Sequence, residues 1–442
     1  DRFRVVCWWS EQKSARSRYG LAMVTTVRRE DPVQPTLLRT RGSVRPARQS
    51  SLREHNLSLV LRHIVDAGTP MTRARLAKAV GLTRPAVSDL VDRLIAARLV
   101  VESAPEAVER AGRPGVPLLP APGSFVGVGL EVAVDHIGVR ALDLGGTLVT
   151  ERIVEGDFRA SEPNSIFERL LSLCDLVVAQ LDSSSATVAG VCVSVPGLTN
   201  PGGGMVRYAP NLVWQDVDAI AVLRRSPKLR ELPIEVGNDA DLAARAEARQ
   251  RSRASGGSRL DQNFLFISGE VGIGGAIVLG GELAGGLHGW SGEIGHAVVD
   301  PRGPQCGCGA TGCLEQYAGK DALVRRAGLP PGTTITNLLA RVAAGDESAR
   351  TAVEEAGQAV GLAASSALNL LDLDTVVLGG SYAQMFDVLG PTVHAILTER
   401  VLAARWVPVR VESAVSGDFA SLTGAAMRVV DRVVTHPTPW LG

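Results

Sequence analysis

Apolar residues recur at helical spacing in the segment that follows the first fifty residues. This pattern predicts helices over residues 51–68, 72–80 and 83–97, and Ser51 and Glu54 have the spacing of a capping box for the first of them. A short turn with a glycine precedes the third helix. The positions expected to face a common core are Leu57, Val60, Leu61, Ile64, Val65, Val87, Leu90, Val91, Leu94 and Ile95. Three such helices are typical of a helix-turn-helix domain.

The pattern changes to strands from residue 124 onward. Strands are predicted over 125–134, 136–143 and 148–154, followed by a helix over 165–181 and a buried strand over 188–195. Further strands are expected at 234–236, 264–268 and 375–378, and further helices at 321–327, 335–344, 346–371 and 424–434. Mixed strands and helices in this order indicate an α/β fold.

Residues 1–50 are rich in arginine and proline and lack any sustained periodicity, so we expect a mostly disordered basic segment. Met23 is a candidate natural start. The sequence contains neither an apolar run long enough to span a membrane nor a signal peptide, which predicts a cytoplasmic protein without a membrane partner. Cys7, Cys174 and Cys192 have no disulfide-like spacing, as expected in a reducing compartment.

The formal net charge is zero, but the charges are unevenly distributed. Residues 1–118 hold 21 Lys and Arg against 11 Asp and Glu, whereas the remainder holds 25 against 35. A basic head on an acidic body is typical of a DNA-binding domain joined to a sensor of an uncharged ligand. A basic tail without a partner is the alternative for residues 1–50.

The start of the third predicted helix is the candidate DNA-reading surface. The N-terminal part of such a helix enters the major groove, and Thr83 is a plausible N-cap for it. The candidate DNA contacts here are Thr83, Arg84, Pro85, Ala86 and Ser88. A three-helix bundle without DNA-binding activity would share the same apolar pattern.

A wing is predicted after this helix. Residues 99–101 read as a strand, and Arg110 and Arg113 follow on a stiff, proline-containing loop that suits a narrow minor groove. An interdomain linker is the alternative interpretation of this loop, and both interpretations are compatible.

Four metal-ligating residues fall within eighteen positions: His296, Cys306, Cys308 and Cys313. Three thiolates and one imidazole are a common tetrahedral zinc set, and four protein ligands leave no open position for water. The sequence therefore predicts a structural zinc site. A group of buried or reactive thiols is the alternative.

The stretch GEIGH, followed by CxCxxxxC and Leu314-Glu315, resembles the signature of the ROK family of repressors, open reading frames and sugar kinases. The resemblance covers roughly residue 124 to the C-terminus and implies an actin-like, two-lobed sugar-binding fold. The family's kinases consist of that fold alone, and its repressors add an N-terminal winged helix-turn-helix. The expected division is a disordered segment 1–50, a winged helix with linker 51–118, a first lobe 119–245 with a closing helix at about 420–442, and a second lobe 246–419 with the zinc loop.

The family's kinases bind phosphate at a DxGGT loop, which Asp143–Thr147 matches in letters. The register argues against that role, because the kinase loop joins the first two strands and Asp143 ends the second. Residues 145–146 are then a hairpin turn. The counterpart is the turn from Glu131 to Asp135, where side chains replace the glycines and a carboxylate would repel phosphate. Glu270 likewise stands where the kinases have Gly-Thr-Gly, so ATP binding is not expected.

The sugar side of the family pattern is intact. The matching positions are Asn211, Asn238, Asp239, Glu293, His296 and Glu315. Amide and carboxylate groups at loop ends suit a polyol, because each accepts or bridges hydroxyls. In a kinase Asp239 would be the general base. A helix cap is the alternative for Asn238 and Asp239.

These observations predict a cytoplasmic, sugar-responsive transcriptional regulator of the ROK family, and a repressor before an activator. Its expected partners are operator DNA, a monosaccharide or sugar-phosphate effector, and further copies of itself in a homodimer or tetramer; its expected cofactor is structural zinc. Sugar binding would change the angle between the lobes, and the zinc loop and closing helix would pass that change to the winged helices. An ATP-dependent hexose kinase with an added DNA-binding head is one alternative, and a regulator that binds a partner protein is another.

Overall fold

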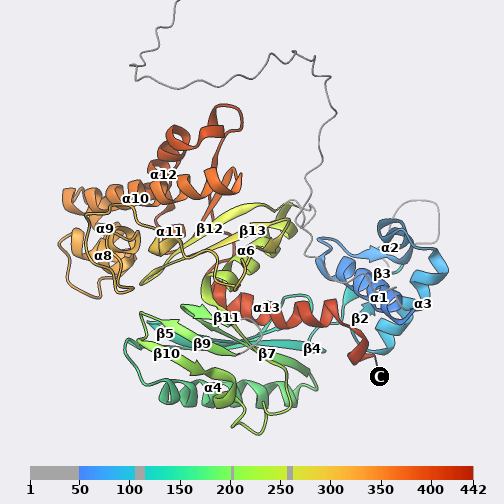
Figure 1. The fold of residues 1–442 in the computed structure, drawn as a ribbon. Helices are drawn as coiled ribbons and strands as arrows, with labels where there is room; N and C mark the ends of the chain where they lie inside the picture. Colours follow the sequence, from blue (N-terminus) through green and yellow to red (C-terminus); the bar gives the residue numbers. More distant parts are fainter. Residues whose placement is uncertain (1–48, 105–114, 201–203, 256–261, 442) are drawn as a thin grey trace, which may run out of the picture. The chain divides into compact units, whose positions relative to one another are not determined.

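The computed structural model describes residues 49–104, 115–200, 204–255 and 262–441 (Figure 1). The chain's internal contacts separate Asp1–Ala47 from one compact unit, Arg48–Gly442, to which all described residues belong. The predicted disorder of residues 1–50 thus falls almost entirely outside the described part. No helix among the described residues is long and apolar enough to cross a membrane.

The N-terminal domain is a winged helix, as predicted. Within residues 49–120, the described part forms α1 (Gln49–Asp66), β1 (Met71–Thr72), α2 (Arg73–Val80), α3 (Arg84–Ala96), β2 (Val100–Glu102) and β3 (Pro117–Pro120), with sheet order β1-β3-β2. Thr72 caps α2 and Thr83 caps α3. Helix α1 begins at Gln49, so Ser51 lies inside the helix and the predicted capping box is wrong.

The first lobe contains a sheet with strand order β11-β7-β4-β5-β6. Its strands are β4 (Phe125–Val132), β5 (His136–Asp143), β6 (Leu148–Glu155), β7 (Thr187–Val195) and β11 (Ile234–Asn238). Helix α4 (Pro163–Ser183) packs on one face, and α13 (Ala420–Thr435) packs on the other. Gly129 permits this second contact, because a Cβ there would lie 2.5 Å from the carbonyl oxygen of Leu422. A small sheet of β8 (Leu198–Thr199), β9 (Met205–Ala209) and β10 (Trp214–Asp218), then α5 (Ala219–Leu223), completes the described lobe.

The second lobe is built on a sheet with strand order β14-β13-β12-β15-β16. Its strands are β12 (Phe264–Gly269), β13 (Ile273–Leu279), β14 (Glu282–Leu283), β15 (Thr375–Gly380) and β16 (Arg410–Ser413). Its helices are η2 (Ile294–His296), α7 (Glu315–Ala318), α8 (Lys320–Arg326), α9 (Ile335–Ala343), α10 (Glu347–Leu371), α11 (Ser381–Gln384), α12 (Phe386–Arg400) and η3 (Leu402–Arg405), and η4 (Thr438–Trp440) follows α13 near the C-terminus. The α/β class and the two-lobed arrangement agree with the prediction.

Helix α6 (Asp239–Ser255) joins the lobes. It continues directly from strand β11 of the first lobe, and its buried alanines pack on the second-lobe sheet. Its other neighbour is α13, whose residues also complete the apolar core of the winged helix. In Figure 1, α13 (red) extends from the lobes to the blue helices of the N-terminal domain.

Candidate functional site

The four predicted metal ligands converge. The ligand atoms of His296, Cys306, Cys308 and Cys313 all lie within 4.8 Å of one another. Cys306 Sγ is 3.8 Å from His296 Nδ1, and Cys308 Sγ is 3.7 Å from Cys313 Sγ. A zinc–sulfur bond of about 2.3 Å gives a tetrahedron with edges of roughly 3.8 Å, so this donor set fits zinc in both chemistry and spacing.

Backbone geometry draws this loop together. Bridges between Val298 and Cys313, and between Gln305 and Thr311, close it. Gly312 has a φ of +76°, and a Cβ there would lie 1.6 Å from the carbonyl oxygen of Asp300. Only glycine fits this position, which explains the glycine beside Cys313. Two other cysteines, Cys174 and Cys192, are buried away from the cluster, and burial raises the pKa of each thiol to about 12.

Asn238 and Asp239 stand at the N-terminus of α6. The Asn238 side chain accepts a hydrogen bond from the Asp241 N–H and donates one to the Gly197 carbonyl, each at 3.0 Å, so it does cap the helix. Asp239 Oδ1 accepts from the Ala240 N–H at 2.8 Å. Burial, with the charges of Glu131 and Glu293, raises the pKa of Asp239 to about 7.

Two other predicted sugar contacts, Asn211 and Glu315, approach Gly272. A Cβ on this glycine would lie 2.4 Å from Glu315 Oε2 and 2.6 Å from Asn211 Nδ2, so both side chains approach the bare backbone. Glu315 also accepts a hydrogen bond from the Ile273 N–H at 3.3 Å, and its other oxygen lies 3.9 Å from Cys306 Sγ. Burial and the charge of Glu315 raise the pKa of Glu293. The predicted residues therefore share one region next to the metal cluster.

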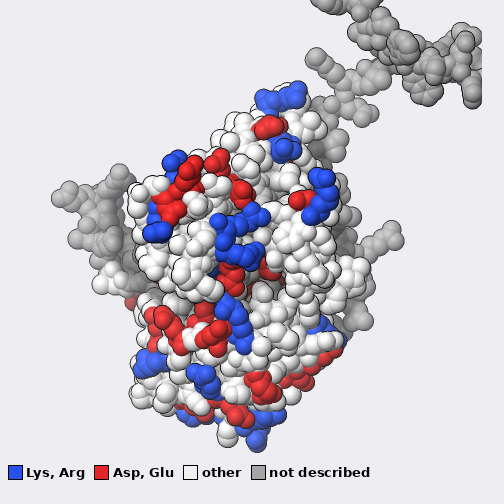
Figure 2. Space-filling model, turned by 90° about the vertical axis from the view of Figure 1, so that its left-hand side faces the viewer, with Lys and Arg blue, Asp and Glu red and all other residues white. Residues whose placement is uncertain are grey.

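The turn from Glu131 to Asp135, which the sequence predicts to stand in place of the kinase phosphate loop, holds an ionic cluster. It joins β4 to β5, and the Ala133 N–H donates to the His136 carbonyl at 2.9 Å. His136 Nδ1 lies 2.9 Å from Asp135 Oδ1, and its Nε2 lies 3.2 Å from Glu131 Oε2. Lys320 of α8 lies 3.7 Å from Asp135. Figure 2 shows acidic and basic side chains meeting in the hollow between the lobes.

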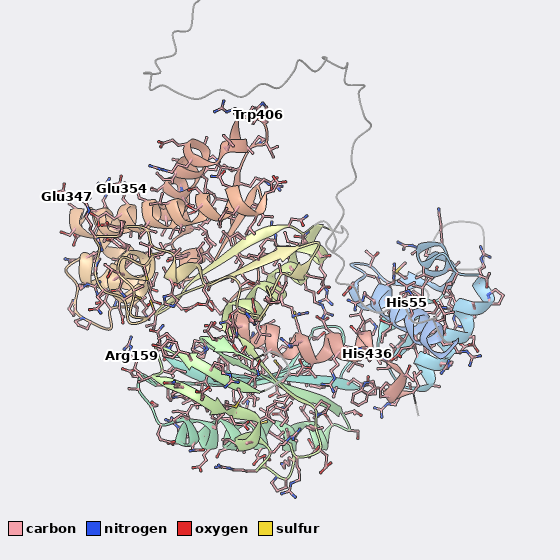
Figure 3. All side chains as sticks on the ribbon, in the orientation of Figure 1. His55, Arg159, Glu347, Glu354, Trp406 and His436 are labelled. Carbon is pink, nitrogen blue, oxygen red and sulfur yellow. The ribbon has the colours of Figure 1, made fainter. Side chains whose placement is uncertain are left out.

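These contacts determine the protonation of the cluster. Burial alone would lower the pKa of His136, but its contacts with Asp135 and Glu131 outweigh burial and raise the pKa to about 10. Desolvation and the charges of Asp135 and Glu131 raise the pKa of Glu270 to about 8. His136 and Lys320 were not predicted from the sequence. The partners of His136 lie one and five residues before it, at Asp135 and Glu131, whereas Lys320 reaches Asp135 from the other lobe. A second link between the lobes joins Arg159 to Asp321 at 3.2 Å (Figure 3).

The Asp143–Thr147 motif is a hairpin turn, as its register predicted. Strand β5 ends at Asp143, and Asp143 Oδ1 accepts a hydrogen bond from the Thr147 N–H at 2.8 Å. Its second oxygen accepts from the Gly123 N–H at 3.2 Å. Asp143 is 4 % exposed, so its carboxylate stabilises the hairpin turn and the backbone at Gly123.

The candidate DNA-reading residues lie at the exposed start of α3. Thr83 caps the helix by accepting a hydrogen bond from the Ala86 N–H at 3.4 Å. Arg84, Pro85 and Ala86 are exposed, whereas Ser88 is half-buried. The predicted minor-groove residues Arg110 and Arg113 fall outside the described residues.

Helix α2 adds basic residues that the sequence reasoning missed. Arg75 and Lys78 are exposed on this helix, which in such domains crosses the DNA backbone. Arg73 instead bonds within the domain, at 2.7 Å to Asp92 and 2.9 Å to Glu102, and thereby ties α2 to α3 and the wing.

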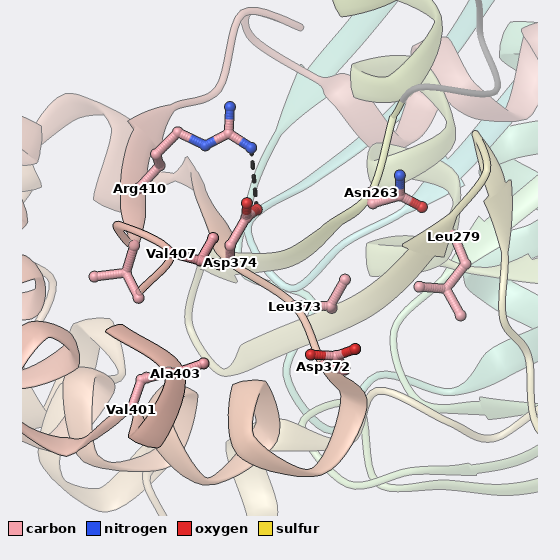
Figure 4. Close-up of a pocket in the computed structure, with 10 residues that line it drawn as sticks. Asn263, Leu279, Asp372, Leu373, Asp374, Val401, Ala403, Val407 and Arg410 are labelled. Atoms are coloured by element: carbon pink, nitrogen blue, oxygen red, sulfur yellow. Dashed lines mark hydrogen bonds and ion pairs between the residues drawn. The ribbon is translucent and has the colours of Figure 1, made fainter. Parts of the chain in front are cut away.

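A separate shallow pocket of about 330 Å³ lies on the second lobe (Figure 4). Leu279, Leu373 and Val407 line it, together with the ion pair between Arg410 and Asp374 at 3.0 Å. It contains none of the predicted ligand or metal residues.

Comparisons with known proteins agree with this architecture. Residues 128–432 match the ROK family and residues 58–111 match the MarR family. The xylose repressor of Bacillus subtilis is 25% identical over 87% of this chain and 97% of its own length. The kanosamine kinase of Amycolatopsis mediterranei is 32% identical over 66% of this chain and 94% of its own length.

The fold also matches a solved structure. The crystal structure of a ROK family transcriptional regulator, a homologue of the Escherichia coli MLC protein, aligns with a TM-score of 0.71 at 24% identity, covering 87% of this chain and 97% of that one. Because the ROK match extends over well more than half of its length, the chain belongs to the ROK family.

Proposed function

We propose that this protein is a sugar-responsive, DNA-binding transcriptional regulator that represses carbohydrate genes in the cytoplasm. The observation that carries the proposal is that one compact unit holds both a winged helix with an exposed α3 N-terminus and a group of polar side chains around the start of α6. The similarity to a named repressor over nearly that protein's whole length, winged helix included, supports it.

The effector is a monosaccharide held by Asn211, Asn238, Asp239, Glu293, His296 and Glu315. The carboxylates among them suit hydroxyl groups and disfavour a sugar phosphate, because phosphate carries charge of the same sign. Zinc held by His296 and the three cysteines would keep the loop beside Glu293 and Glu315 in place. It would act structurally, since the four ligands complete its coordination.

Kinase activity is the rival function, favoured by the similarity to kanosamine kinase and by an Asp239 whose pKa of about 7 would suit a general base. The charges near the phosphate position argue against it. A triphosphate would meet the carboxylates of Glu131 and Asp135 at one turn. At the other it would meet the buried side chain of Glu270, whose pKa of about 8 leaves it largely uncharged at neutral pH but which still occupies space. The first turn has side chains in place of the open glycine backbone that binds phosphate in such loops, and in the second turn Asn211 and Glu315 already approach the one glycine, Gly272.

We also propose that the functional assembly is a homodimer or tetramer that places two α3 helices in successive major grooves, about one helical turn apart. The domains are taken as 51–118, 119–245 with 420–442, and 246–419. Regulation through a partner protein would leave DNA binding intact and abolish any response to sugars.

Arg84→Ala tests the DNA-reading surface. If Arg84 reads a base edge, the substitution should weaken binding to a duplex selected from a random pool by about 1–3 kcal/mol. Fluorescence anisotropy of the labelled duplex measures this loss. Arg93→Ala is the matched control, because Arg93 is exposed in the last turn of the same helix. Equal affinity of Arg84→Ala and wild type would remove Arg84 from the contact surface.

A further inference from the structure

Helix α6 begins among the cleft residues and ends against the DNA-binding domain. Its first residue is Asp239, and near its last turn Arg253 Nη2 donates to the carbonyl oxygens of Val65 at 3.1 Å and Gly145 at 2.9 Å. Seventeen helical residues at 1.5 Å each span about 25 Å. One unbroken element thus connects the cleft to α1 of the winged helix.

The contact at Arg253 is specific. Val65 lies at the C-terminal end of α1, where backbone carbonyls lack helical partners and a cation is favoured. Gly145 belongs to the hairpin whose letters match a phosphate loop. Gly146 in that turn has a φ of +78°, and a Cβ there would lie 3.0 Å from Arg253 Nη1. The glycine pair therefore leaves room for a guanidinium in this structure.

Arg249 strengthens the same junction. It is 2 % exposed, and its Nη1 lies 3.1 Å from Asp431 of α13. Its Nη2 donates to the Leu144 carbonyl at 3.5 Å, and its Nε lies 4.0 Å from Asp66 at the end of α1. Three segments that are distant in sequence meet at two arginines one turn apart.

The second lobe holds α6 firmly. Ala243, Ala244 and Ala248 are buried against its sheet. Glu247 is fully buried, and its carboxylate accepts hydrogen bonds from the N–H groups of Val415 at 2.9 Å and Ser416 at 2.8 Å, just beyond β16. Helix α6 is therefore anchored to the second lobe as well as to α13.

The first lobe, by contrast, holds the DNA-binding domain through α13. Arg62 of α1 donates to Thr435 Oγ1 at 2.9 Å, and His436 lies 3.5 Å from Glu54 (Figure 3). Helices α6 and α13 pack closely at Gly424, where a Cβ would lie 1.8 Å from the Leu242 carbonyl oxygen. A rotation about this contact would move Arg253, about 16 Å further along α6, relative to α1 and the hairpin.

We propose that the C-terminal end of α6 delivers the motion of the lobes to the winged helix, and that Arg253 is the positioning residue that transmits it to α1 and the glycine hairpin. This inference rests on the proposed sugar response. In this inference the Asp143–Thr147 hairpin is the surface on which Arg253 docks. Helix α6, and not the zinc loop, carries the motion of the lobes to the winged helix.

Hydrogen exchange on the full chain tests this route, with D-xylose, D-glucose, D-mannose and N-acetylglucosamine as probes. In wild type, a sugar that slows amide exchange at the start of α6 should also change exchange in the last turn of α1 by at least about fivefold. Arg253→Met should keep the response at the start of α6 and reduce the response in α1 to less than about twofold.

Arg251→Met is the matched control, because Arg251 lies on the same helix but pairs with Glu247 and Glu412 and stacks on Phe264 of the second lobe. It should keep both responses. Arg253→Lys covers the case in which Arg253→Met fails to fold, because a lysine keeps the charge but not the planar fork and should give an intermediate response in α1.

If either Arg253 variant shows the same sugar-induced change of amide exchange in α1 as wild type, the inference is wrong, but the proposed sugar response is unaffected. If no probe changes exchange at the start of α6 in wild type, the proposed function fails and the inference fails with it.

Discussion

Replacing Cys306 with serine is expected to release zinc and to lower the free energy of unfolding by several kcal/mol. Serine keeps its proton at neutral pH and is a poor zinc ligand, so the tetrahedral set loses one corner. The loop that carries the ligands packs Cys313 and Leu314, both fully buried, into the second lobe. Because that lobe has its own apolar core, we expect a loss on the order of 3–5 kcal/mol, not complete unfolding.

Elemental analysis and thermal unfolding of both proteins measure this effect. Cys192→Ser is the control, because Cys192 is a buried thiol of the first-lobe sheet outside the metal cluster. It should keep one zinc per chain. Wild-type protein without stoichiometric zinc, or a Cys306→Ser protein that retains zinc, would contradict the assignment.

Asp239→Asn is expected to weaken sugar binding by about 10–100-fold, in keeping with the loss of a charged hydrogen bond. Affinity for DNA should remain, so the variant should stay bound to DNA in the presence of sugar. Asp241→Asn is the control, because Asp241 lies in the same helical turn and its carboxylate interacts with Arg245 and Arg428. Calorimetric titration with the four monosaccharides measures the change.

The pH dependence gives a second test of Asp239. Burial raises the pKa of this carboxyl to about 7, so it is largely protonated at pH 6 and largely ionised at pH 8. The ionised form accepts hydroxyl hydrogen bonds at both oxygens, and wild-type sugar affinity should therefore rise across this interval. Asp239→Asn should flatten that rise. A pH profile shared by wild type and variant would assign the titration to another group.

The helices of the winged helix could be predicted because apolar spacing and caps both mark them. Thr83 before α3 is an example, since its side chain bonds the Ala86 N–H where the sequence pattern expects a cap. Strands β1 and β3 were not predicted, because β1 has only two residues and β3 begins and ends with proline. So few residues carry no alternating pattern, and proline suits only edge or irregular pairing.

Helix α6 was missed for a different reason. Its sequence is DADLAARAEARQRSRAS. Leu242 is its one large apolar residue, and its other buried side chains are mostly alanines, with Glu247 and Arg249, so the helix looks polar all round. Close packing needs small residues here, because both α13 and the second-lobe sheet press against the helix. The spacing of large apolar residues therefore cannot predict such a helix.

The cluster of metal ligands and the grouping of the polar cleft residues followed from short motifs. The ionic cluster did not. His136 directly follows Asp135, but the hairpin is needed to bring its ring to Glu131, and only the meeting of the two lobes brings Lys320 to Asp135. Pairings of this kind depend on the path of the chain. Ion pairs between distant elements cannot be predicted from a local sequence pattern.

Sugar-dependent DNA binding tests the central claim most directly. Full-length protein is titrated onto a duplex selected from a random pool, with and without each of the four monosaccharides, and ADP release with ATP and magnesium is followed in parallel. The account predicts that at least one sugar changes the Kd for DNA by about fivefold or more, while ADP release stays at background. Sugar-dependent ADP release at an ordinary enzyme rate of about 1 s⁻¹ or faster, with an unchanged Kd for DNA, would contradict it.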